Sequence, residues 1–327
     1  MKNLVLTTAD VRPDLGMKHA TMTKTGLKLV GLCSVLIATW AAAGPAWGKV
    51  AVFVSLVPQK YFVQQIGRDL VDIQVTIPAG ADLHTYEPKP RQMAAIARAQ
   101  LYFAIGIEFE KAWLKKLSRI NPRMKVVQTD QGIQKISMAA AHHRKETDSH
   151  HAQIDHGQEK GYPASRGLDP HIWLSPPLVK KQAHAILTAL TEVDAANRST
   201  YQANYQAFAA GLAELDSELK NILSAKRGFQ FMVFHPAWGY FAQTYGLQQV
   251  PVEIEGKTPK PAQLKELIEH ARENDIKVIF AQPQFSARSA ELIAREIGGQ
   301  VVFADPLAED WAGNLRKVAR QIAVESR

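Results

Sequence analysis

Short apolar runs and amphipathic stretches alternate along most of the chain. The run V-A-V-F-V-S-L-V-P, which begins at Val50, has the pattern of a buried strand. It is followed by K-Y-F-V-Q-Q-I-G-R-D-L, with apolar residues at helical spacing, and then by V-D-I-Q-V-T-I-P, a second strand pattern. Strand, helix and strand in repetition predict βαβ units around a mainly parallel sheet. The fold class that we expect is therefore α/β.

Two blocks of alternating strand and helix patterns stand on either side of a helical segment. We predict a first lobe over residues 49–175, linking helices over 176–226 and a second lobe over 227–327. The amphipathic pattern from about Asn197 to Ala225 would form a helix of roughly 42 Å. Because a helix of that length does not fit inside one lobe, we expect it to join the two.

The first 48 residues have the pattern of a secretory signal. Lysines precede an apolar run at 29–43, and small residues follow up to Gly48, so we expect cleavage after Gly48. The run is shorter than the roughly 20 residues that a spanning helix needs, although an uncleaved anchor is the alternative. The chain's one cysteine, Cys33, lies in this segment after Leu32, where a lipoprotein signal would have a small residue. We therefore predict an exported, periplasmic protein without a lipid anchor.

Charge and cysteine usage narrow the possible functions. The chain of 327 residues carries a formal charge of +8, of which residues 1–48, with five basic and two acidic residues, contribute +3. The remaining +5 is mild, and no run of Lys and Arg interleaved with aromatic residues occurs, so we expect no nucleic-acid partner. Since the exported part has no thiol, any metal site in it must use His, Asp and Glu.

Three isolated histidines share one kind of position. His84 and His171 lie in proline-bounded loops, and His235 ends the strand pattern F-Q-F-M-V-F-H. Three imidazoles and an oxygen ligand can form a tetrahedral zinc site, and Asp305, at the end of V-V-F-A-D, is the candidate fourth ligand. The alternatives are that each histidine is a local structural residue and that Asp305 is a turn aspartate.

A second group of histidines lies in a polar segment. Residues 139–167 have too little apolar content to pack, so we predict a mobile loop. Its imidazoles could form weak auxiliary metal contacts, and a solvated linker without function is the alternative. The histidines are His142, His143, His150, His151 and His156.

With these residues identified, six motifs carry a resemblance to a known family. They are H-T-Y-E-P-K-P at 84–90, D-P-H-I-W-L-S-P at 169–176, F-H-P-A-W-G-Y-F at 234–241, E-I-E-G-K-T-P-K-P at 253–261, A-Q-P-Q-F-S at 281–286 and A-D-P-L-A at 304–308. In these motifs and their order the chain resembles the cluster A-I solute-binding proteins of ABC transporters, of the zinc-uptake type.

The resemblance implies both a fold and a function. It implies two Rossmann-like βα lobes with mainly parallel sheets, joined by a long rigid helix, and a metal site between them formed by His84, His171 and His235. Asp305 is carried over as the fourth ligand, with water as the competitor. The implied function is capture of Zn²⁺ and its delivery to an ABC permease, by a monomer that is not an enzyme.

Two other functions remain as alternatives. Members of the family that select manganese usually have a glutamate at the position of His235. A manganese or iron binder of the same fold is therefore a less expected function than a zinc binder. An exported zinc hydrolase would use a three-histidine metal with a bound water as nucleophile. The sequence contains no H-E-x-x-H motif and no clearly placed general base, so it does not favour the hydrolase hypothesis.

Overall fold

The computed structural model describes residues 48–81, 86–138, 167–254 and 256–324. The chain divides between Gly48 and Lys49 into two units, and the description below concerns the second. Within the described residues, no helix is both long enough and apolar enough to cross a membrane.

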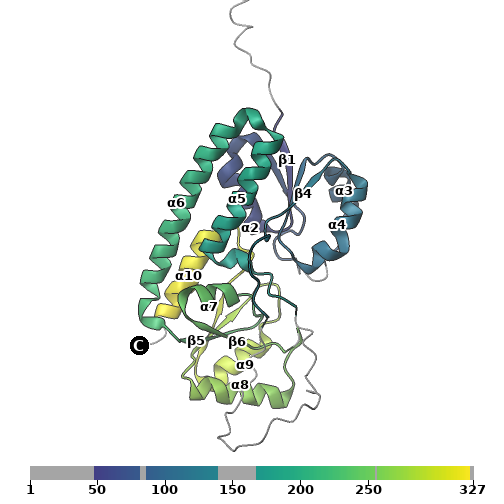
Figure 1. Ribbon diagram of the computed structural model, residues 1–327. Coiled ribbons are helices and arrows are strands. Elements are labelled where there is room, and N and C mark those ends of the chain that lie inside the picture. Colours follow the sequence, from purple (N-terminus) through teal and green to yellow (C-terminus); the bar gives the residue numbers. More distant parts are fainter. Residues whose placement is uncertain (1–47, 82–85, 139–166, 255, 325–327) are drawn as a thin grey trace, which may run out of the picture. The chain divides into compact units, whose positions relative to one another are not determined.

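The first lobe is built on a parallel sheet with the strand order β2-β1-β3-β4 (Figure 1). Its central strand β1 is an almost wholly apolar run of β-branched and aromatic residues, which is typical of a parallel strand buried on both faces. The strands are β1 (Val50–Val54), β2 (Val71–Val75), β3 (Leu101–Ala104) and β4 (Lys125–Gln128).

Helices cover both faces of this sheet. On one face Val52 and Val54 pack into the main core with α2 (Val57–Gly67), and on the other Phe53 packs in a separate core with Ile96 and Leu117. These last two residues belong to α3 (Pro90–Ile96) and α4 (Glu108–Ile120), which therefore form the outer layer of the first lobe.

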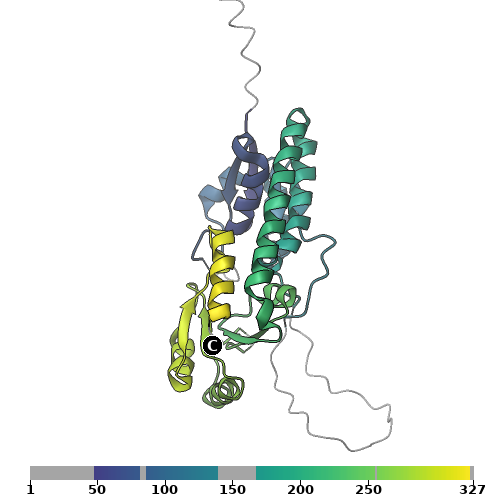
Figure 2. The same cartoon turned by 90° about the vertical axis from the view of Figure 1, so that its left-hand side faces the viewer.

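A helical segment connects the lobes. It contains the short 3-10 turn η2 (Ile172–Leu174), α5 (Pro176–Val193) and the 25-residue helix α6 (Arg198–Ile222). Helix α6 packs against α5 over part of its length and also contacts α2 of the first lobe and α10 of the second (Figures 1 and 2). Short 3-10 turns lie at the helix ends: η1 (Arg68–Leu70), η3 (Ala195–Asn197) and η4 (Ser224–Lys226).

The second lobe repeats the plan with the strand order β6-β5-β7-β8, again parallel throughout. Its sheet packs on α7 and α10 on one face and on α8 and α9 on the other. The strands are β5 (Gln230–Val233), β6 (Gln248–Pro251), β7 (Val278–Ala281) and β8 (Gln300–Phe303). The helices are α7 (Gly239–Tyr245), α8 (Pro261–Glu273), α9 (Arg288–Ile297) and α10 (Trp311–Val324).

Aromatic side chains join the lobes where α10 meets α2. Trp311, at the start of α10, lies 5.2 Å from the ring of Phe62 and 6.1 Å from that of Tyr61, and both of these residues belong to α2. The ring of Phe208, on α6, lies within 6.2 Å of both α2 rings. The predicted α/β class with two parallel-sheet lobes and a long connecting helix is thus confirmed.

Candidate metal centre

His171 lies just before the turn η2, between the first lobe and α5. Its Nδ1–H donates to Oδ1 of Asp169 over 2.7 Å, and the same oxygen accepts the backbone N–H of His171 over 2.8 Å. Both side chains are 1% exposed. Pro170 restricts the backbone between them, so the imidazole is held by a short, stiff segment of chain.

His235 follows the carboxyl end of β5. Its Nδ1–H donates to Oε1 of Glu253 over 2.8 Å. Gln282 holds its backbone through two hydrogen bonds, since it accepts the N–H of His235 at 3.1 Å and donates to its carbonyl at 2.8 Å. The His235 and Glu253 side chains are 9% and 8% exposed. The metal candidate in the second lobe is therefore fixed at both its main chain and its ring.

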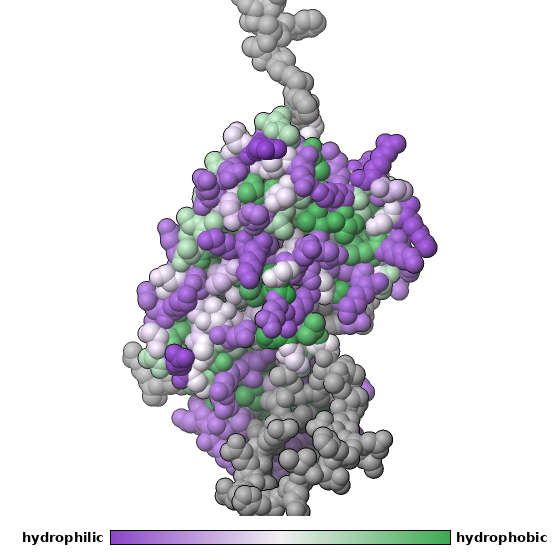
Figure 3. Space-filling view, in the orientation of Figure 1, coloured by the Kyte–Doolittle hydropathy of each residue, from purple (hydrophilic) through white to green (hydrophobic). Residues whose placement is uncertain are grey.

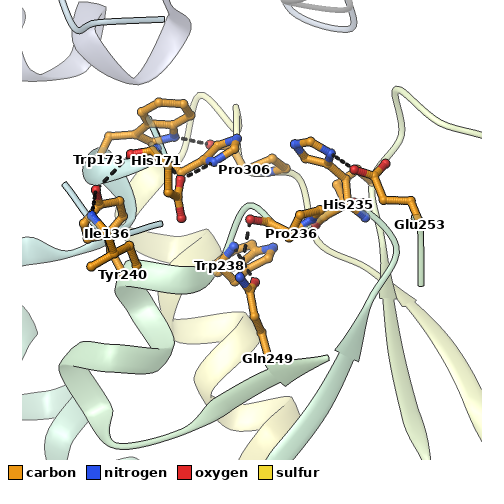
Figure 4. A network of polar contacts seen from close by, with 12 residues as sticks. Ile136, His171, Trp173, His235, Pro236, Trp238, Tyr240, Gln249, Glu253 and Pro306 are labelled. Atoms are coloured by element: carbon orange, nitrogen blue, oxygen red, sulfur yellow. Dashed lines mark hydrogen bonds and ion pairs between the residues drawn. The ribbon is translucent and has the colours of Figure 1, made fainter. Parts of the chain in front are cut away.

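These two imidazoles lie side by side (Figure 4), although they come from different parts of the chain. Their ring centroids are 5.3 Å apart, with the planes at 71°. In a tetrahedral zinc site each imidazole centre lies about 3.2 Å from the metal, which places two such centres roughly 5.2 Å apart. The observed spacing is thus the one that two histidines on a shared zinc ion would have.

The carboxylates determine which ring nitrogen can bind a metal. In His171 and His235 alike, Nδ1 carries the proton that is donated to the carboxylate, so the lone pair is on Nε2. A carboxylate behind a metal-binding histidine also orients the ring and raises the basicity of the ligand nitrogen. Asp169 and Glu253 are therefore part of the candidate site without being ligands themselves.

Aromatic rings enclose the histidine pair. The ring of Trp173 lies 5.0 Å from that of His171, and the ring of Phe285 stacks on His235 at 5.2 Å and 25°. Trp173 also reaches the second lobe, since its Nε1–H donates to the carbonyl of Pro306 at 2.8 Å. A ring shell of this kind limits the access of water to the ligands.

The segment that carries Asp169 is anchored by Tyr240 of α7 (Figure 4). The Tyr240 hydroxyl donates to the carbonyl of Asp169 at 2.8 Å and accepts the N–H of Ile136 at 3.1 Å. Burial raises the pKa of Tyr240 to about 12, so the hydroxyl keeps its proton. The neighbouring Gly239 has no room for a side chain, because a Cβ there would lie 2.7 Å from Oδ2 of Asp169.

Asp305 lies after β8, as predicted, and is half-buried. Its Oδ1 accepts hydrogen bonds from Nε2 of Gln284 at 2.8 Å and from the N–H of Leu307 at 2.9 Å. Its carbonyl accepts from Nδ2 of Asn314 at 2.8 Å. These bonds orient the carboxylate, and its role as a fourth ligand stays a prediction.

The other predicted ligands lie outside the described residues. They are His84 and the five histidines of the polar loop, His142, His143, His150, His151 and His156. Among the residues that the structure describes, no three of His, Cys, Asp and Glu are grouped so as to hold a metal ion. The described part of the candidate centre is therefore the histidine pair with its two carboxylates.

Sequence reasoning missed the two carboxylates, and one of them had a readable signal. Strands β5 and β6 pair in parallel with Val233 opposite Pro251, so His235 and Glu253, each two residues further on, come to lie together. Asp169 stands two residues before His171 in the motif D-P-H. Without the strand register, the contact of His235 with Glu253 could not be derived from the sequence.

Comparisons with known proteins agree on one family. The family model described as "Zinc-uptake complex component A periplasmic" matches residues 52–324. The "High-affinity zinc uptake system protein ZnuA" of Bacillus subtilis (strain 168) is 28% identical over 292 residues, which cover 84% of this chain and 86% of that protein.

Two solved structures are also similar to this chain. A crystal structure of ZnuA is 43% identical and covers 84% of this chain and 98% of its own, with a TM-score of 0.74. The structure of a ZnuA deletion mutant with zinc bound is 44% identical, covering 84% and 97%, also with a TM-score of 0.74.

Proposed function

Because the chain belongs to the family of periplasmic zinc-uptake components, the solute-binding proteins of cluster A-I, we propose that it captures Zn²⁺ outside the cytoplasmic membrane and delivers it to the permease of an ABC importer. The family is a metal-binding transport component, which accords with a protein that binds and releases its cargo without chemical turnover. A relative with the name of a zinc uptake protein and a zinc-bound structure of 44% identity support zinc as the cargo.

His171 and His235 are two of the ligands in this proposal, with His84 as the third. The observation that carries it is the 5.3 Å spacing of two buried imidazoles, each backed by a carboxylate. The fourth position falls to Asp305 or to a water molecule.

The donor set favours zinc over manganese. Neutral imidazole suits zinc, whereas manganese prefers carboxylate and water oxygens. Here the carboxylates of Asp169 and Glu253 accept from Nδ1 of the two histidines, so each pair offers the cargo an imidazole nitrogen and not a carboxylate oxygen. The intrinsic affinity of such a site is higher for Cu²⁺ than for Zn²⁺. Selectivity against copper would therefore have to come from the tetrahedral geometry of the site and from the supply of each metal.

The remaining parts of the proposal concern export of the protein, its domain bounds and the histidines of its polar loop. The signal at residues 1–48 is removed after Gly48, and the mature monomer has lobes at 49–175 and 227–327 joined by the helices at 176–226. The histidines of the 139–167 loop raise the local zinc concentration near the principal site. The family's periplasmic description supports this location.

Calorimetric titration with zinc tests the ligand assignment. Replacing His171 or His235 with alanine should weaken zinc binding by more than the roughly 10–100-fold that loss of a supporting residue causes, because a ligand itself is removed. The matched control is His184→Ala, since His184 is exposed on α5 and contacts the ring of Tyr205. Unchanged affinity in either ligand variant, or equal losses in all three variants, would rule out the proposed site.

A further inference from the structure

The outer layer of the first lobe holds the positive charge of the exported chain. Residues 86–128 contain nine basic and three acidic residues, a net charge of +6, against +5 for residues 49–327 as a whole. All nine basic side chains are exposed, whereas Glu110 is buried. The basic residues are Lys89, Arg91, Arg98, Lys111, Lys115, Lys116, Arg119, Arg123 and Lys125.

Helix α4 arranges part of this charge in a line. Lys111, Lys115 and Arg119 follow one another at a spacing of four residues, which places them on one side of the helix. The opposite side is buried through Phe109, Glu110 and Leu117. Like charges four residues apart destabilise a helix, so this row has a cost in helix stability. Departures from local preference of this kind are expected at functional sites.

Ion pairing does not neutralise the layer. Among the described residues, only Lys125 of the nine forms an ion pair, with Glu192 of α5. Elsewhere basic side chains are matched to acidic ones: Arg272 of α8 pairs with Glu296 of α9, and Arg316 of α10 pairs with Glu218 of α6. The excess positive charge is thus a property of the α3–α4 layer.

The apolar side chains of α4 lie toward the core, since Trp113 and Leu114 pack against the buried clusters of the first lobe. Trp113 and Leu114 are partly exposed, Ile120 is 43% exposed, and the ammonium of Lys116 lies 4.3 Å from the ring centre of Trp113. The space-filling view shows hydrophobic side chains over this part of the lobe, with strongly hydrophilic ones projecting around them (Figure 3). Because α4 uses its apolar side for the core, the exposed side of the layer offers mainly positive charge to a partner.

We propose that the α3–α4 layer, defined by the basic residues above other than Lys125, which pairs with Glu192 on the opposite face of the sheet, binds the anionic headgroups of a lipid bilayer. Charge complementarity favours this partner, because long flexible Lys and Arg chains can neutralise a diffuse negative surface. The layer faces away from α6, on the other side of the sheet from α2. The effect is to concentrate the protein at the membrane surface.

Binding to vesicles tests this directly. The full-length mature protein is sedimented with phosphatidylcholine vesicles that do or do not contain phosphatidylglycerol, at low and at physiological salt. We expect binding only to the anionic vesicles and weaker binding at the higher salt concentration. Replacing Lys115 and Arg119 with glutamine should weaken binding about 25-fold, since each cation near an anionic surface contributes roughly a fivefold gain.

The control is the double variant K180Q/K181Q, because Lys180 and Lys181 are exposed cations of α5, outside the layer. It should bind anionic vesicles like the unchanged protein, and both variants should keep full zinc affinity, which separates this inference from the zinc site. No binding to anionic vesicles, or equal loss in both variants, would overturn the proposal. It would also be overturned if K115Q/R119Q bound vesicles normally but delivered less zinc to the permease in neutral lipid, because the partner would then be an acidic protein surface.

Discussion

At the scale of single residues, the carboxylates behind the two histidines are the features that most affect the site. Glu253 accepts a hydrogen bond from Nδ1–H of His235, and its side chain is 8% exposed. A carboxylate there stabilises the positive charge that a metal places on the imidazole, whereas a neutral amide can only accept the hydrogen bond.

We therefore expect Glu253→Gln to weaken zinc binding about 10–100-fold while leaving the folded structure intact. Titration calorimetry measures the affinity and circular dichroism checks the fold. Glu266→Gln, on the same lobe but exposed on α8, is the matched control and should bind zinc normally. Unaltered affinity in Glu253→Gln would mean that the carboxylate does not support the ligand.

A buried acid in the first lobe plays a different part. Glu110 is 3% exposed and accepts hydrogen bonds from Ser55 Oγ at 2.5 Å, from the N–H of Ile105 at 2.9 Å and from the N–H of Gly106 at 2.6 Å. Burial raises its pKa, opposed by these donors. The side chain thereby ties together the carboxyl ends of β1 and β3.

Because the folded-state pKa is raised, the acid contributes stability below its unfolded pKa of about 4.3, and this contribution is lost as the pH rises through the folded value. In either orientation of its amide, Glu110→Gln turns an N–H toward the backbone N–H of Ile105 or of Gly106, which should cost about 1–3 kcal/mol of unfolding free energy. The deficit should be largest below about pH 4.3 and shrink at higher pH, where the native acid ionises.

Denaturant unfolding of both proteins across this pH range measures the deficit. Glu108→Gln, an exposed position on the same helix, should show no pH-dependent difference from the unchanged protein. A deficit in Glu110→Gln that grew with pH would show that the folded-state pKa is lowered.

At the scale of elements, the alternation of strand and helix patterns was sufficient to predict the lobes. The apolar run of β1 predicts a strand and the amphipathic spacing of α6 predicts a helix, each from local sequence alone. Contacts between elements depend on register and packing, which a single sequence does not encode locally. The meeting of His235 with Glu253 and the bond from Trp173 to Pro306 are of that kind.

Trp173 connects the linker to the second lobe in two directions. It donates to the carbonyl of Pro306, and its own carbonyl accepts Nε1–H of Trp311 at 2.7 Å. Both tryptophans are almost fully buried. Trp173→Phe would keep an aromatic ring in place but would leave the Pro306 carbonyl without its donor.

The expected loss in unfolding free energy is about 1–3 kcal/mol, the cost of an unsatisfied buried polar group. Chemical denaturation followed by circular dichroism measures it. Tyr205→Phe, which removes only a hydroxyl from a partly exposed ring of α6, should change stability by no more than about 0.5 kcal/mol. Equal, small effects of the two substitutions would show that the bond to Pro306 does not stabilise the junction.

At the scale of the whole molecule, the histidine pair draws on two separate parts of the chain. His171 lies at the end of the first lobe, where the chain leads into the connecting helices, whereas His235 follows strand β5 of the second lobe. A ligand that binds only the folded state stabilises it in proportion to the logarithm of its concentration over its dissociation constant, which gives about 2.7 kcal/mol at a hundredfold excess. Zinc bound at this pair should therefore raise the stability of linker and second lobe together.

His235→Ala should abolish most of this zinc-dependent gain, while deletion of residues 142–156 should leave most of it, because weak loop contacts contribute little where the principal site is intact. Thermal unfolding with and without zinc, at equal protein concentration, gives the two shifts. If the deletion removed the gain and His235→Ala kept it, the loop would be the principal site. The pairing of His171 with His235 would then serve to hold the linker against the second lobe.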